Sequence, residues 1–174
     1  MKAEIKQKWL QDRQRYPKKP WLKEPSIIAI RWYRHGQSVD LMKDGLFKTI
    51  QLKIYWLIFH ILEVVLGISI PKSVKSGGGL RIYHFGNIFI HRNAVFGENC
   101  TLRQGVTIGN RYNDDLAPQL NNNIELGAYA QVLGGITIGD NAKVGAMSVV
   151  LKDIAANMTA CGVPAKIISS KGIE

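Results

Sequence analysis

His84 and His91 are the two histidines of the central region, and each could transfer a proton. An imidazole titrates near neutral pH, so it can act as a general base. His84 stands six residues before Ile90, where a repeating apolar row calls for an aliphatic side chain. An imidazole in such a row is costly unless it has a partner or leaves the interior. His84 is the candidate base, with a structural histidine bonded to backbone as the alternative, and His91 is expected on the surface.

Other reactive side chains give weaker signals. Cys100 and Cys161 form neither a disulfide framework nor a metal-binding spacing. Two histidines in this region are too few for a three-imidazole zinc site, so no metal is expected. Cys100 and Ser148 fall in a row of small residues, so we expect them to fill the core rather than to act as nucleophiles.

A six-residue repeat organises residues 70–154. Large apolar residues recur every six positions over 90–108 and again over 120–150, and a second, mostly small row lies two positions earlier. An amphipathic helix would repeat every 3.6 residues and a half-buried strand every 2. A six-residue repeat is typical of parallel β-helices. The spacing predicts a triangular coil of three short strands per turn, with both rows pointing inward.

Glycine often follows the large apolar residue, at Gly97, Gly109, Gly127, Gly139 and Gly145. We expect these glycines at corners with positive φ, which glycine adopts without strain. The repeat also divides the chain. Residues 1–67 are predicted to be a helical region, 68–168 the β-helix with a loop at 110–119, and 169–174 a tail.

The N-terminal region lacks the repeat and is predicted to be helical. A polar helix is expected over residues 1–15 and another over 27–38, capped by Ser26 and ending near Gly36. Residues 46–66 are the most apolar segment of the chain. We expect a helix buried on the β-helix or in a subunit contact. Contact with a membrane surface is the alternative, because His60 and Glu63 would be costly inside a bilayer.

Positive charge gathers in the same region. Residues 1–53 carry 13 of the 23 Lys and Arg but only 5 of the 13 Asp and Glu. Solvated helices explain this, and so does attraction to an anionic partner such as phosphate groups or a lipid surface. Nucleic acid is not expected, because no recognition motif accompanies the charge. Residues 1–23 are too polar for a cleavable signal peptide, so we expect a cytoplasmic protein, with the inner membrane surface as an alternative position.

Four runs of sequence carry a specific resemblance: GGLRIYHFGNIFI, NAVFGENCTLRQGVTIGN, IELGAYAQVLGGITIGDNAKVGAMSVVLKDI and CGVPAKII. They resemble the serine acetyltransferase branch of the hexapeptide acyltransferases, and within it the short colanic-acid-type polysaccharide O-acetyltransferases. The resemblance implies a left-handed β-helix, a homotrimer, His84 as the base, and acetyl-CoA as donor in a groove between neighbouring subunits. We expect donor contacts at Ala128, Gly145, Ala146, Gly162 and Lys166, because small residues admit the pantetheine arm and Lys166 can meet a phosphate. Turn geometry alone is the alternative for the alanines.

The chain departs from the serine enzymes at the positions that recognise serine. Ser69 stands where those enzymes carry an Asp that orients the base, and Tyr83 where they carry an Asp that helps to hold serine. Residues 115–118 read Asp-Leu-Ala-Pro where the family carries an Arg that binds the substrate carboxylate. A carboxylate site without its guanidinium loses much of its affinity. The departures therefore favour another hydroxyl acceptor, and a sugar is the natural candidate.

The minimum chemistry for such a transfer is one base and a donor for the oxyanion. Besides Tyr83, the loop residues Asn113, Asp114 and Asp115 offer hydrogen bonds to sugar hydroxyls; a solvated loop is the alternative. The main hypothesis is an acetyl-CoA-dependent O-acetyltransferase acting on a saccharide of a surface polysaccharide. Serine O-acetylation in cysteine biosynthesis and a non-catalytic scaffold are the other two.

Overall fold

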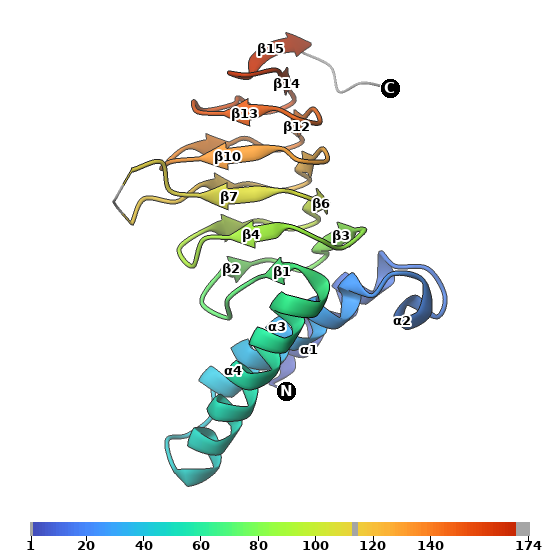
Figure 1. Ribbon diagram of the computed structural model, residues 1–174, viewed down its shortest axis with the longest axis vertical. Coiled ribbons are helices and arrows are strands. Elements are labelled where there is room, and N and C mark those ends of the chain that lie inside the picture. Colours follow the sequence, from blue (N-terminus) through green and yellow to red (C-terminus); the bar gives the residue numbers. More distant parts are fainter. Residues whose placement is uncertain (1, 113–114, 170–174) are drawn as a thin grey trace.

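The computed structural model describes residues 2–112 and 115–169, in which short strands wind into a parallel β-helix above a cluster of helices (Figure 1). About five turns stack in register. Each of the first four gives one strand to each of three sheets, and the fifth reaches sheet B only through the isolated bridge of Ile154 to Ile138. Sheet A contains β1 (Ile68–Ser69), β4 (Ile88–Ile90), β7 (Thr107–Gly109), β10 (Gln131–Leu133) and β13 (Val149–Val150). Sheet B contains β2 (Lys75–Ser76), β5 (Val95–Phe96), β8 (Gln119–Leu120) and β11 (Thr137–Ile138). Sheet C contains β3 (Arg81–Tyr83), β6 (Thr101–Arg103), β9 (Glu125–Leu126), β12 (Lys143–Val144) and β14 (Thr159–Cys161), and ends with the antiparallel β15 (Lys166–Ser169).

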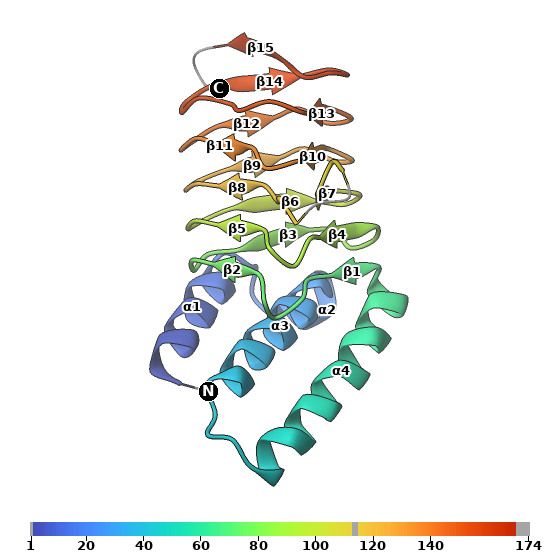
Figure 2. The same ribbon diagram turned by 90° about the vertical axis from the view of Figure 1, so that its left-hand side faces the viewer.

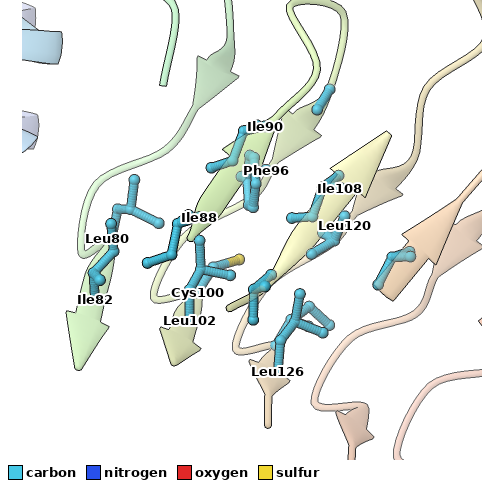
Figure 3. Packing of buried hydrophobic residues seen from close by; sticks show 14 of the residues in the cluster. Leu80, Ile82, Ile88, Ile90, Phe96, Cys100, Leu102, Ile108, Leu120 and Leu126 are labelled. Atoms are coloured by element: carbon cyan, nitrogen blue, oxygen red, sulfur yellow. The ribbon is translucent and has the colours of Figure 1, made fainter. Parts of the chain in front are cut away.

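The predicted inward rows form the core of the prism. Every large residue of the repeat from Ile90 to Val150 is at most 4% exposed, and the small row from Ile88 to Ser148 is buried as well. Side chains from successive turns stack on one another, as Figure 3 shows for Leu102 and its neighbours. Burying one such side chain contributes about 1.5–3 kcal/mol, so the stacked rows are the main source of stability.

The glycines of the repeat have a different role from the one expected. None of Gly97, Gly127 and Gly139 has positive φ; a Cβ on Gly127 would lie 2.5 Å from the backbone nitrogen of Ala146 in the next turn. A Cβ on Gly139 would lie 2.4 Å from the nitrogen of Ala156. These glycines are therefore required because successive turns approach closely. Positive φ occurs two residues later in each corner, as at Asn99 and Asn141.

Three helices, α1 (Ala3–Gln14), α2 (Pro20–Lys23) and α3 (Ser26–Asp40), lie under the first turn (Figure 2). Arg34 of α3 and Asp12 of α1 form an ion pair with 2.8 Å between Nε and Oδ2, and both side chains are fully buried. The backbone nitrogen of Leu80 donates to Asp12 at 2.8 Å, and Arg34 donates to the carbonyl of Gly77. Because each partner would be an uncompensated buried charge without the other, this pair fixes how the helices dock on the β-helix.

The glycines before β3 let α1 come this close. A Cβ on Gly78 would lie 1.7 Å from Oε1 of Gln11, and Arg15 donates to the carbonyl of Gly79. These glycines therefore allow the close approach of the N-terminal helix to the first turn.

Two helix boundaries differ from the predictions. Ser26 does not cap α3; its hydroxyl donates to the carbonyl of Ile82 at 2.8 Å and ties the helix to β3. Gly36 does not end α3, which continues to Asp40, because its missing side chain makes room for the ring of Tyr55. Tertiary packing decided both positions over local preference.

Helix α4 (Leu46–Leu66) has the predicted bounds but is not buried on the β-helix. Only Tyr55, Phe59 and Leu66 are buried. Tyr55 and Phe59 pack against α3, and Leu66 joins the core cluster where the helix meets β1. Figure 1 shows α4 slanting away from the prism, joined to it at β1. The opposite face of α4 leaves a row of large apolar side chains exposed.

Candidate functional site

Half of the predicted site residues lie on or directly beside one edge of the prism, where sheet C turns into sheet A (the C–A edge). It comprises the corners at residues 84–87, 104–106, 127–130 and 145–148. Backbone hydrogen bonds link successive corners: Gly105 N to Gly86 O (2.9 Å), Tyr129 N to Gln104 O (2.9 Å) and Met147 N to Ala128 O (2.8 Å). Residues far apart in sequence are therefore aligned along a single line.

His84 lies at the first corner of this edge, exposed to solvent and with φ of 60°. It is not the inward residue that the repeat implied. That place is held by Ile82, which is fully buried and aligns with Leu102 of the next turn. Ile82 and Ile90 are eight residues apart rather than six, and the two extra residues carry His84 out of the prism. The expected break in the apolar row is therefore wrong, while the exposed ring is accessible, as a general base must be.

The end of α4 holds this corner in place. The backbone nitrogen of Ile88 donates to the carbonyl of Gly67 at 2.8 Å, directly after the helix. Gly67 has φ of 60°, and a Cβ there would lie 2.9 Å from the nitrogen of Asn87. Glycine is thus required where the helix ends against the corner that carries His84. Ser69, in the position of the family's orienting Asp, lies on β1 opposite Phe89.

A groove of about 530 Å³ runs along sheet C and the C–A edge. It brings together four of the predicted residues, Tyr83, Ala128, Gly145 and Ala146. The other lining residues are Arg15, Thr101, Arg103, Glu125, Leu126, Gly127, Lys143, Val144 and Thr159. Gly162 and Lys166 lie at the far end, beyond the groove, where Gly162 accepts from Val149 N and Lys166 pairs with Cys161.

The groove has a basic and aromatic lower end that sequence reasoning missed. The Cζ atom of Arg81 lies 3.7 Å from the ring centroid of Tyr83, and that of Arg103 lies 5.3 Å away. Arg81 also pairs with Glu24 at 3.1 Å. Tyr83 and Arg103 face each other in the register of β3 and β6. Only this register reveals the cluster, since the two residues are twenty positions apart in the chain.

The predicted acceptor loop lies on another edge. Asn113 and Asp114 fall outside the described residues. Asp115 is exposed between sheets A and B, where its carboxylate is 3.2 Å from Arg92. Figure 1 shows this loop on the side of the prism away from β3. Within one chain, Asp115 does not join His84 and Tyr83. His91 lies on the A–B edge too, where its Nδ1 accepts from the nitrogen of Asn93.

Cys100 and Ser148 are buried, as expected. Burial raises the pKa of the Cys100 thiol to about 11, so it stays protonated and unreactive at neutral pH. The Ser148 hydroxyl is fully buried and accepts from the nitrogen of Gly162 at 3.0 Å. Both are structural. Over the described residues, no group of three His, Cys, Asp or Glu side chains could hold a metal ion.

Known proteins with similar sequences are named as acetyltransferases. The family described as bacterial transferase hexapeptide (six repeats) matches residues 118–152. A serine acetyltransferase of Synechococcus elongatus is 36% identical over 120 residues, covering 68% of this chain and 49% of the relative. An Escherichia coli (strain K12) protein named for acetyl transfer in colanic acid biosynthesis, WcaB, is 41% identical over 108 residues, covering 62% of this chain and 67% of the relative. This chain spans about half the length of the Synechococcus relative.

Solved structures extend the match to the N-terminal helices. A serine acetyltransferase of Neisseria gonorrhoeae superposes with a TM-score of 0.81 at 28% identity, covering 97% of this chain and 67% of that one. A soybean serine acetyltransferase complexed with serine gives 0.80 at 25% identity, covering 96% and 70%. The predicted left-handed parallel β-helix with N-terminal helices is thereby confirmed.

Proposed function

The chain belongs to the hexapeptide-repeat transferase family, and from that premise we propose that it is an acetyl-CoA-dependent O-acetyltransferase acting on a sugar hydroxyl. The observation that carries the proposal is the position of His84. His84 comes directly after Tyr83 in the chain, and its side chain is accessible. Tyr83 lines the groove together with Ala128 and Ala146. A base at one end of a groove lined by small residues suits a hydroxyl that attacks an extended thioester.

The residues fit this donor. Acetyl-CoA supplies an activated acetyl group, so the protein needs no covalent intermediate, in keeping with the buried Cys100 and Ser148. Ala128, Gly145 and Ala146 leave room for a narrow chain against the backbone, and Gly162 and Lys166 lie beyond them for the nucleotide end. His84 takes the proton as the acceptor oxygen bonds to the acetyl carbon, and returns it to the departing sulfur. Such a base contributes ~10²–10⁴-fold.

We propose that the active form is a homotrimer. The loop around Asp115 and the corner at His84 occupy different edges of one prism, so only a loop from another copy can approach His84. The groove along sheet C would then be closed by a neighbouring subunit. A cytoplasmic location, where acetyl-CoA is made, belongs to the same proposal.

Serine acetylation is the second candidate, favoured by the many similar serine acetyltransferases. Against it stands the cluster around Tyr83. Serine carries an ammonium group, and this end of the groove presents Tyr83, with the guanidinium of Arg103 beside it, where the serine enzymes carry an Asp. A cationic group placed among guanidiniums is repelled.

One assay separates the two candidates. Release of CoA thiol from acetyl-CoA is followed with serine, free sugars and nucleotide sugars as acceptors. We expect turnover with a sugar class and none above background with serine. The matched control is His84→Asn, which keeps a residue tolerant of positive φ but removes the base. Serine as the best acceptor would replace this proposal with the second candidate, and no release with any acceptor would contradict both.

A further inference from the structure

We propose that Arg103 and Tyr83 form a subsite for an anionic group of the acceptor, a phosphate or carboxylate carried near the hydroxyl that is acetylated. The inference rests on the proposed function and narrows its substrate class. Arg103 is exposed, and its guanidinium lies over the Tyr83 ring with 5.3 Å between Cζ and the ring centroid. A guanidinium that faces a ring keeps its N–H donors in its own plane, where they can bind an anion in a fork.

The neighbouring arginines are already engaged. Arg81 pairs with Glu24, and Arg15 donates to the carbonyl of Gly79 and the hydroxyl of Thr101. Glu24 compensates the charge of Arg81, and the hydrogen bonds of Arg15 hold it in place. Arg103 is then the arginine of this end best placed to meet a ligand in the groove.

Position along the groove assigns this charge to the acceptor rather than to acetyl-CoA. Neighbouring strands of a sheet are ~4.8 Å apart. Arg103, on β6, is one strand from β3, which ends next to His84, so it lies at the reactive end. The pantetheine arm keeps the phosphates of acetyl-CoA away from its thioester. Lys143, on β12, is three strands from β3, ~14 Å away, where donor phosphates belong.

The far end has its own unmet polar group. Thr159, on β14, is 1% exposed and lines the groove, and its hydroxyl has no hydrogen-bond partner among the described residues. A buried hydroxyl without a partner costs about 1–3 kcal/mol, which a ligand can offset. The groove therefore presents polar groups at both ends, and the two ends serve different molecules.

The experiment compares acceptors and variants. Acceptors are a nucleotide sugar (UDP-glucose), glucose 1-phosphate, glucuronic acid and uncharged glucose. We expect kcat/KM to be at least ~10-fold higher for an anionic acceptor than for glucose, and Arg103→Gln to remove that advantage with an unchanged KM for acetyl-CoA. Arg103→Lys should restore part of it, since it keeps the charge but not the fork. Lys143→Gln is the matched control and should raise only the KM for acetyl-CoA.

The preferred anion tells whether the group is a phosphate or a carboxylate. Equal use of glucose, or a higher KM for acetyl-CoA in Arg103→Gln, would overturn the subsite. Calorimetric titration of glucose 1-phosphate and of glucuronic acid into the CoA-saturated protein separates the subsite from catalysis. If one of these two anions binds and Arg103→Gln weakens its binding, the subsite is supported even where acetyl transfer is absent. If neither anion binds, the subsite is overturned.

A second, independent observation concerns α4. We infer that its exposed face packs against the same face of α4 in other copies of this chain. The exposed apolar residues follow a strict 3-4-3-4-3 spacing: Phe47 (66%), Ile50 (45%), Ile54 (39%), Leu57 (63%), Ile61 (50%) and Val64 (84%). Spacing of this kind is that of a coiled-coil seam, and isoleucine at both core positions favours three or more helices.

The flanks of this seam favour a helix over lipid as the occupant. Leu46 and Val65 widen the apolar face, while Lys48 and Lys53 are the only Lys or Arg residues in α4. A helix that lies on a membrane surface is usually rich in Lys and Arg beside its apolar face. By length and composition alone α4 could span a bilayer, but Lys53, His60 and Glu63 lie along it.

Mass measurement by light scattering tests the seam. Leu57→Glu should give a smaller assembly than the unmodified protein, whereas Leu22→Glu, at a still more exposed leucine of α2, should not. Leu57→Cys should form disulfides between copies and Leu22→Cys should not, in a Cys161→Ser background. An unchanged mass in Leu57→Glu without cross-linking in Leu57→Cys overturns the inference. The inference is also overturned if the unmodified protein is a monomer that sediments with anionic vesicles, and if Leu57→Glu abolishes this sedimentation.

Discussion

Two edges of the prism have the same turn geometry but carry different residues. On the edge where sheet B turns into sheet C (the B–C edge), the positive-φ residues are Asn99, Asn123, Asn141 and Asn157. Their side chains form a ladder, with Nδ2 to Oδ1 distances of 3.3, 3.0 and 3.0 Å. Asparagine tolerates this backbone conformation better than other residues with a side chain. Every local choice on this edge favours stability.

The C–A edge is different. Gly86, Asn87 and Gly105 suit positive φ there, but three other residues do not. His84, Tyr129 and Met147 hold φ of 60°, 60° and 59°. For bulky residues this conformation costs roughly 1–2 kcal/mol each. Tyr129 and Met147 remain 47% and 67% exposed, so burial of their side chains does not offset the cost. Strain that packing does not explain concentrates at functional sites. The difference shows that one edge holds the fold together and the other presents side chains for binding.

The largest expected effect is at His84. His84→Asn should lower kcat by ~10²-fold or more through loss of the general base, with an unchanged melting temperature, because Asn tolerates the local φ. His84→Ala should lose the same activity and should have a slightly lower melting temperature, because alanine does not suit the local φ. Acetyl-transfer kinetics and thermal unfolding check both. Near-normal activity in His84→Asn would make His91 the next candidate.

On the other edge, Asn141→Ala should affect stability alone. It removes side-chain hydrogen bonds to Asn123 and Asn157 and places alanine at φ of 59°. We expect the free energy of unfolding to fall by about 2 kcal/mol with unchanged kcat and KM. Denaturant titration measures the loss. Asn141→Gly separates the two contributions, since it relieves the backbone strain but still breaks the ladder. A change in KM would mean that the B–C edge is not purely structural.

A matched pair of alanines sharpens the comparison. Ala146 and Ala156 occupy the same place in their corners, and the backbone nitrogen of each packs against a glycine of the preceding turn. Only Ala146 lines the groove. Ala146→Leu should raise the KM for acetyl-CoA by ~10-fold, because the added atoms fill the space for the donor. Ala156→Leu should leave it unchanged. Equal effects of the two substitutions would remove Ala146 from the donor site.

The fold could be predicted from the sequence because the repeat recurs every six residues over most of the β-helix. Its row of large residues predicted the core. The asparagines of the B–C ladder stand three positions after several of them, but this pattern is evident only in the structure. The glycines were misassigned because their constraint comes from the next turn, at least sixteen residues away. His84 was misplaced because a six-residue count cannot register the two extra residues after Ile82. The sequence left open whether α4 packs on the β-helix or in a subunit contact, because an apolar face does not identify its own partner.

The smallest expected effect distinguishes strain that serves binding from strain that is incidental. Met147 follows Ala146 at the rim of the groove, and its φ of 59° suits asparagine better than methionine. Met147→Asn should therefore raise the free energy of unfolding by about 1 kcal/mol and, if its side chain contacts the donor, raise the KM for acetyl-CoA several-fold. Denaturant titration and steady-state kinetics on the same sample measure both. Greater stability with an unchanged KM would show that the C–A edge is strained without benefit to acetyl-CoA binding. In that case the contrast between the edges would rest on His84 and Tyr129 alone.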